Sequence, residues 1–195
     1  MTAIAGIVQR DGSVLIGGDS LSSGVDIAIV NASGGSGTKV FSLSGSRFAV
    51  GVTGSCRITQ LLRHKFTPPP PSGLAPSFYM IDWVEALRSF AKEHDLLVLK
   101  DGRGWLDDCR LLVGVSGHLF EVQADFSLLE AADGYAAIGC AQEIVRGAIH
   151  AQIASLVEDE IIPSCRVLER ALEAAAHFDI HVRGPFNFAT ARWTD

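Results

Sequence analysis

The sequence predicts an α+β fold in four layers, α-β-β-α, in which two antiparallel sheets are stacked between two pairs of helices. The predicted elements follow one another as strands, two helices, strands, two helices and a last strand. Because the helices come in pairs instead of alternating with strands, a doubly wound parallel sheet is disfavoured. The 195 residues, 48% of them hydrophobic, suffice for a substantial core. We expect residues 1–195 to form a single domain.

The first half of the chain is rich in strand signals. We expect strands at residues 2–9, 13–19, 26–30, 38–43 and 47–53. Asp11-Gly12 is a hairpin dipeptide between the first two strands. Residues 32–37 contain too much glycine and serine for an element interior and predict a loop. A helix begins near Ser55 and must end before the four prolines at 68–71, which lack amide donors and favour an extended form.

The second half continues with a helix at about 78–94. Its apolar stripe is predicted to consist of Ile81, Val84, Leu87 and Ala91. Residues 100–104 predict a turn-rich break, within a loop that runs to residue 108. We expect further strands at 109–116, 118–123, 126–131, 134–138 and 185–191, and helices at 141–157 and 164–178.

Composition narrows the range of functions. Sixteen basic and 22 acidic residues give a net charge of −6, which argues against nucleic acid as a partner. The chain has no apolar run of the ~20 residues that a membrane helix needs and no signal-peptide pattern at its start, so we expect a cytoplasmic protein without a membrane partner.

The cysteines predict neither a metal site nor a cofactor. The four cysteines are widely scattered, with no C-x-x-C pair and no histidine at metal-ligand spacing. In a cytosolic protein, we expect most of them to be buried free thiols.

Thr2 raises a chemical question. Initiator methionine is usually removed when a small residue follows, and removal of Met1 would give Thr2 a free α-amine beside its hydroxyl. A threonine hydroxyl needs a neighbouring base to act as a nucleophile. An α-amine, with a reference pKa of about 7.7–8.0, is partly neutral near pH 7 and can accept that proton. Thr2 considered alone is more commonly just the first residue of a strand.

Four segments occur in the order and spacing of a known family. They are T-A-I-A-G-I-V-x-x-D-G-x-V-x-x-G-G-D-S at residues 2–20, Lys39-Val40-Phe41, Gly51-Val52-Thr53-Gly54-Ser55 and Ala137-Ile138-Gly139-Cys140. Together they resemble proteasome β-type subunits, including HslV, the bacterial peptidase served by an ATP-driven unfoldase. The resemblance implies an N-terminal-nucleophile (Ntn) threonine peptidase with the four-layer fold. It also implies homo-oligomeric stacked rings, peptide or unfolded-protein substrates and an ATP-dependent unfoldase as partner.

The resemblance also implies roles for individual residues. The matched positions are Thr2 as nucleophile, Asp19 as an acid that orients the lysine, Lys39 as active-site lysine, Gly54 as oxyanion-hole glycine, Cys140 where the family usually has a serine, and Asp179 as a further acid. A nearby lysine charge would favour the neutral α-amine, and a glycine lets its N–H approach a substrate carbonyl closely.

Each position also has a structural interpretation. Lys39 could be a solvated strand residue, Asp19-Ser20 a turn, Gly54-Ser55 a helix cap and Asp179 a helix-end residue. A thiol at Cys140 is a weaker hydrogen-bonding group than a hydroxyl. A non-enzymatic ring with a decayed site, and a small-amide Ntn hydrolase, are therefore the alternatives. We predict a threonine-type peptidase whose activation depends on removal of Met1.

Overall fold

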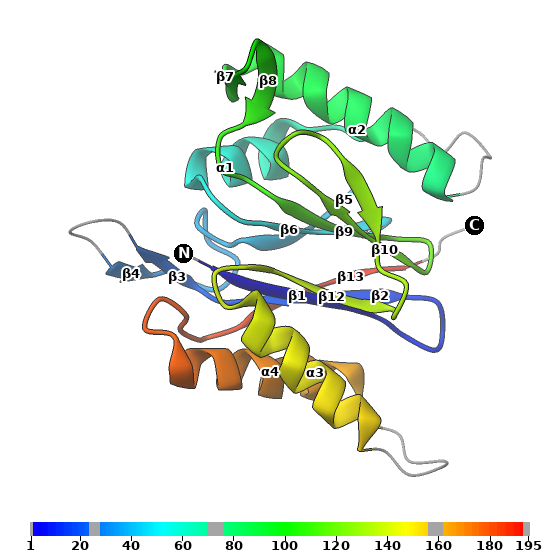
Figure 1. Ribbon diagram of the computed structural model, residues 1–195, viewed down its shortest axis with the longest axis vertical. Helices are drawn as coiled ribbons and strands as arrows, with labels where there is room; N and C mark the ends of the chain where they lie inside the picture. Colours follow the sequence, from blue (N-terminus) through cyan, green and yellow to red (C-terminus); the bar gives the residue numbers. More distant parts are fainter. Residues whose placement is uncertain (1, 24–27, 70–75, 156–161, 193–195) are drawn as a thin grey trace.

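A computed structural model describes residues 2–23, 28–69, 76–155 and 162–192. Figure 1 shows two sheets stacked face to face, with α1 and α2 covering the outer face of one and α3 and α4 covering the outer face of the other. This arrangement confirms the four-layer α-β-β-α fold. Predicted residues 26–27, 70–71 and 156–157 lie outside the described ranges.

The first sheet carries the start of the chain. Its order is β12-β1-β2-β13, with all neighbours antiparallel. The strands are β1 (Ala3–Val8), β2 (Val14–Gly18), β12 (Tyr135–Gly139) and β13 (Asn187–Ala191). Ala3 lies opposite Gly139 on β12, and Ile4 lies opposite Gly18 on β2. This register brings the end of β12 and the end of β2 to the first residues of β1.

The second sheet has the order β11-β10-β9-β6-β5 and is also antiparallel. Its strands are β5 (Val40–Leu43), β6 (Phe48–Val52), β9 (Leu111–Val115), β10 (His118–Val122) and β11 (Leu128–Glu130). Two short ribbons lie outside the sheets: β3 (Leu21–Ser23) with β4 (Ala28–Val30), and β7 (Leu97–Lys100) with β8 (Arg103–Leu106).

The four helices are α1 (Cys56–Lys65), α2 (Pro76–Glu93), α3 (Gln142–Ala154) and α4 (Ser164–Phe178). Ser55 caps α1, because its Oγ accepts a hydrogen bond of 3.2 Å from the Arg57 amide. The basic residues Arg63, His64 and Lys65 occupy its last turn, where they suit the negative end of the helix dipole. In the described part of the chain, no helix is both long and apolar enough to span a membrane.

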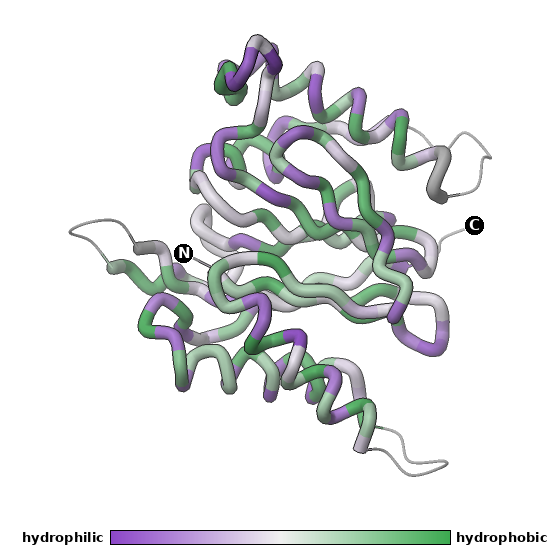
Figure 2. The backbone as a smooth tube through the Cα atoms, viewed as in Figure 1, coloured by the Kyte–Doolittle hydropathy of each residue, from purple (hydrophilic) through white to green (hydrophobic). Residues whose placement is uncertain are grey.

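β1 is apolar throughout because both of its faces are buried. Ala3 and Ala5 belong to the core beneath α3 and α4, whereas Ile4 belongs to the core between the two sheets. A Cβ at Gly51 would lie 2.5 Å from Ile4 Cγ2, so a glycine on β6 makes room for Ile4. Figure 2 shows apolar residues along the central strands and hydrophilic residues at the turn after β1.

The predicted stripe of α2 is wrong at one position. Ile81 is 55% exposed, whereas Met80 and Trp83 are fully buried beside the predicted Val84, Leu87 and Ala91. The buried face is therefore rotated toward the larger side chains, and Trp83 packs edge-on against Phe66 with ring centroids 5.2 Å apart.

Three local predictions need correction. The turn-rich break and loop at 100–108 is in part the β7–β8 hairpin, because Asp101 (φ 51°) and Gly102 (φ 73°) form a tight turn between the two strands. The strand expected at 126–131 spans only β11, since Phe126 has a left-handed backbone (φ 69°). Strand β3, just after Asp19, was not expected at all.

Candidate active site

The peptide bond between Thr2 and Ala3 is held from two sides. The Thr2 carbonyl oxygen accepts a hydrogen bond from the Cys140 amide at 2.9 Å, and Cys140 Sγ lies 3.4 Å from the same oxygen. The Ala3 amide donates to Asp19 Oδ1 at 3.0 Å, and the Asp19 amide donates to the Ala3 carbonyl at 3.1 Å. The ends of β12 and β2 therefore fix the position of Thr2.

Asp19 and Lys39 form a buried ion pair. Lys39 Nζ lies 2.8 Å from Asp19 Oδ1 and 2.9 Å from Oδ2, and it also donates to the Leu21 carbonyl at 2.6 Å. The Lys39 side chain is 8% exposed, and that of Asp19 is fully buried. Asp19 Oδ2 accepts a further bond from the Leu21 amide at 3.0 Å. The carboxylate therefore links the lysine to the backbone of β1 and β3.

Thr2, Lys39 and Gly54 line one small cleft, with a volume of about 50 Å³. The other lining residues come from the segment after β2, the loop before β5, strand β6 and helix α1; they are Leu21, Ser22, Gly37, Val52, Cys56 and Thr59. Thr2 is 5% exposed. The cleft thus brings together Thr2, Lys39 and Gly54 from three distant parts of the chain.

Gly54 is required by the backbone between β6 and α1. Its φ is +90°, and a Cβ there would lie 2.6 Å from the Asp108 carbonyl oxygen. Any other residue would combine left-handed strain with a collision against backbone. The residue lies one position before the Ser55 cap, so Gly54 stands at the N-terminal end of α1 within the cleft.

Cys140 and Asp179 lie on the far side of the Thr2 backbone and do not line the cleft. Cys140 Sγ donates to Asp179 Oδ2 at 3.2 Å. Burial and the hydrogen bond to Asp179 raise the pKa of the Cys140 thiol, so it remains a donor at neutral pH. Desolvation raises the pKa of Asp179, but hydrogen bonds from the His181 amide and Cys140 outweigh it and hold that pKa below its ordinary value.

All six predicted site residues therefore gather around Thr2. Thr2, Lys39 and Gly54 line the cleft, Asp19 and Cys140 contact the backbone or the lysine, and Asp179 acts through Cys140. Gly139 was not among the predicted site residues, although its φ is +106° and a Cβ there would lie 2.0 Å from the Thr2 carbonyl oxygen. Gly139 belongs to the segment Ala137-Ile138-Gly139-Cys140, which resembles the known family, so the sequence already contained the clue to it.

The expectation that most cysteines are buried is wrong. Cys109 is buried, but Cys56, Cys140 and Cys165 are exposed. Scattered spacing argues against a metal site, but it carries no information on burial, which depends on the register of each thiol in its element.

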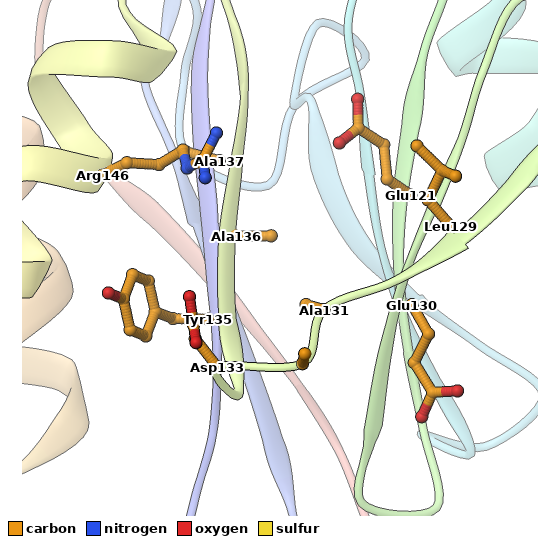
Figure 3. A pocket seen from close by; sticks show the side chains of 10 residues that line it. Glu121, Leu129, Glu130, Ala131, Asp133, Tyr135, Ala136, Ala137 and Arg146 are labelled. Carbon is orange, nitrogen blue, oxygen red and sulfur yellow. The ribbon is translucent and has the colours of Figure 1, made fainter.

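A larger hollow of about 210 Å³ lies between β11 and β12 (Figure 3). Its charged residues are Glu121, Glu130, Asp133 and Arg146. Glu121 pairs with Arg110 at 3.2 Å and Glu130 with His118 at 2.6 Å. None of the six predicted site residues lines this hollow, so it is separate from the cleft at Thr2.

Solved structures of BPH, HslV and Anbu share this fold of two antiparallel sheets between helix pairs. Among solved structures, BPH from Thiobacillus denitrificans, determined in complex with epoxomicin, is 21% identical, with a TM-score of 0.69 over 98% of this chain and 100% of that chain. HslV from Trypanosoma brucei is 18% identical, with a TM-score of 0.66 over 98% and 100%.

A third similar structure is Anbu, an ancestral β-subunit, from Yersinia bercovieri. It is 20% identical, with a TM-score of 0.64 over 97% of this chain and 81% of that chain. No protein-family model and no curated protein sequence matches the chain. At these identities, the solved structures show the fold of this chain.

Proposed function

We propose that this chain is a threonine-type peptidase subunit in which Thr2, exposed by removal of Met1, attacks peptide carbonyls. The observation that carries the proposal is the shared cleft of Thr2, Lys39 and Gly54, with Lys39 anchored on Asp19. The shared fold gives the proposed activity weaker support, because one fold can carry many different functions.

The hydrogen bonds that Lys39 makes favour the α-amine of Thr2 as the base that accepts the hydroxyl proton. An ammonium group has three N–H donors, and Lys39 Nζ has three acceptors in the two Asp19 oxygens and the Leu21 carbonyl. These three acceptors engage all the N–H donors of Lys39. In this proposal it acts through its positive charge, which lowers the pKa of a nearby amine and keeps that amine neutral.

The proposed reaction follows from these assignments. The Thr2 hydroxyl adds to the substrate carbonyl while its α-amine takes the proton. Backbone N–H groups at Gly54 stabilise the resulting oxyanion. The proton then passes to the departing amine, an ester on Thr2 remains, and water hydrolyses it. Cys140 and Asp179 position Thr2 by holding its carbonyl side.

We further propose that the subunits assemble as homo-oligomeric stacked rings that take peptides or unfolded chains delivered by an ATP-dependent unfoldase. Phe178 and Ile180 support assembly, since they are 73% and 84% exposed on either side of Asp179. Exposed apolar side chains beside a site mark a surface that a neighbour covers. Native mass spectrometry tests this point, and a monomer at micromolar concentration would contradict it.

Cleavage of an unstructured reporter peptide by purified protein tests the proposed activity. Thr2→Ala removes the nucleophile and should abolish cleavage without changing the thermal unfolding midpoint, whereas Thr2→Ser keeps a hydroxyl and should retain measurable activity. The decayed-ring alternative is favoured by the thiol at Cys140 and predicts no cleavage by any of the three proteins. A small-amide hydrolase would hydrolyse acyl-amides but leave the peptide intact.

A further inference from the structure

Cys56 places a second nucleophilic side chain in the candidate cleft. It is the first residue of α1, a free and exposed thiol, and it lines the cleft together with Thr2 and Lys39. Its Sγ lies 3.6 Å from the hydroxyl oxygen of Ser22, which also lines the cleft. A hydroxyl at this distance can donate a hydrogen bond to a thiolate sulfur.

The hydroxyl of Thr2 indicates that this cleft is built to receive a molecule. Thr2 is 5% exposed and lines the cleft, and within residues 2–23, 28–69, 76–155 and 162–192 its Oγ has no hydrogen-bond partner. A hydroxyl without a protein partner, on a residue that lines a cleft, is available to a molecule that enters the cleft. A group attached to Cys56 would compete for the same space, which measures only about 50 Å³.

The other three cysteines differ from Cys56. Burial, with the nearby charges of Asp108 and Asp107, raises the pKa of Cys109 to about 12, so that this thiol is both hidden and protonated. The Cys140 thiol donates a hydrogen bond to Asp179, and Cys140 does not line the cleft. Cys165 is exposed, but it lies in the first turn of α4, on the face of the molecule opposite α1 (Figure 1).

We propose that Cys56 is a thiolation site through which a small-molecule disulfide such as glutathione disulfide closes the active-site cleft. The Cys56 sulfur attacks one sulfur of the disulfide, the new S–S bond forms as the old one breaks, and the departing thiolate takes up the proton that Cys56 gives up. A reducing thiol reverses the exchange. The inference rests on the proposed function, because the activity that thiolation blocks is peptide cleavage.

The size of the modifier sets the expected effect. A glutathionyl group is a tripeptide and is far larger than a cleft of about 50 Å³, so it would cover Thr2 and displace any substrate. The small methylthio group left by methyl methanethiosulfonate would fill part of the cleft and should inhibit less at equal occupancy.

The test treats the purified full chain with glutathione disulfide, then follows peptide cleavage and locates the adduct by peptide mass spectrometry. We expect more than tenfold loss of cleavage in proportion to Cys56 occupancy, with recovery after dithiothreitol. Cys56→Ser should keep the rate it shows before treatment. Cys165→Ser, the matched control at an exposed thiol away from the cleft, should lose activity as the parent does.

Failure of the inference can be distinguished from failure of the proposed function. The Thr2→Ala chain, inactive under the proposal, should still be thiolated at Cys56 faster than at Cys140 or Cys109. A parent chain that cleaves peptide at full rate while Cys56 carries the glutathionyl group would overturn the inference and leave the peptidase proposal intact. A lack of Cys56 adduct in both chains would also overturn it.

Discussion

Lys39 Nζ lies 2.8 and 2.9 Å from the two carboxylate oxygens of Asp19, inside a region where neither side chain exceeds 8% exposure. Breaking a buried ion pair leaves one charge without compensation, and this generally destabilises a protein strongly. The same carboxylate accepts hydrogen bonds from the amides of Ala3 and Leu21. Asp19 therefore couples the stability of the fold to the placement of Thr2.

Asp19→Asn tests that coupling. We expect the free energy of unfolding to fall by about 3–5 kcal/mol, because Lys39 then stays buried without its counter-charge. Urea unfolding measures the effect. His118→Gln is the control, since the His118–Glu130 pair is about half exposed and should contribute under ~1 kcal/mol. Equal losses in the two variants would contradict the account.

Lys39→Met tests the role of charge at the site. Without the ammonium group, the pKa of the neighbouring α-amine should rise toward its reference value of about 7.7–8.0. The amine must be neutral to accept a proton, so the rising limb of the pH–rate profile should move to higher pH. Lys39→Arg keeps the charge and should leave the limb near its original position. An unchanged limb in Lys39→Met would argue against an amine base.

Gly139→Ala tests whether β12 positions Thr2. A Cβ at Gly139 would fall on the Thr2 carbonyl oxygen, so the variant must displace Thr2 or unpair the end of β1. We expect peptide cleavage to drop at least about 100-fold, because small displacements of reacting groups have effects of this size. Gly12→Ala has the same left-handed strain, with φ +77° but free space around it, and should only lose about 1–2 kcal/mol of stability.

Because the Cys109 thiol is buried, we expect the protein to lose stability at alkaline pH. Its folded pKa is raised to about 12 from 9.0, chiefly by burial. Below pH 9 the thiol is protonated in both states and contributes no pH dependence. Between pH 9 and about 12 the unfolded chain releases the proton while the folded chain retains it, so the free energy of unfolding falls by up to about 4 kcal/mol.

Urea titrations at several pH values measure the Cys109 effect. Cys109→Ala removes the thiol, and its free energy of unfolding should depend less on pH over the same range than that of the parent. Identical slopes for the two proteins would show that Cys109 does not contribute.

Local patterns were enough to predict the layers, but the candidate site residues came from the resemblance of four segments to a known family. Paired helices between strand groups indicated two sheets, whereas Asp19 and Gly54 were assigned because their segments resemble those of proteasome β-type subunits. The stripe of α2 was misjudged at Ile81 because its register depends on Trp83 packing against Phe66, a contact between two helices. Periodicity within one helix carries no information on such a contact.

The cleft residues that were not predicted from the sequence were missed for the same physical reason. Cys56 and Ser22 reach it only because α1 and the β3 segment meet there, which requires the tertiary fold. Leu21 contributes a backbone carbonyl to Lys39, and a backbone group leaves no trace in residue type. The β7–β8 hairpin was missed for another reason: Asp101-Gly102 suits both an open loop and a tight hairpin turn.

The central claim is that Thr2 is an unblocked and reactive nucleophile. Intact and peptide mass spectrometry of the purified chain, before and after incubation with epoxomicin, tests it most directly. We expect Met1 to be missing and one epoxomicin molecule to attach to Thr2, with no adduct on Thr2→Ala. Retention of Met1 in assembled protein, or an adduct that persists in Thr2→Ala, would contradict it.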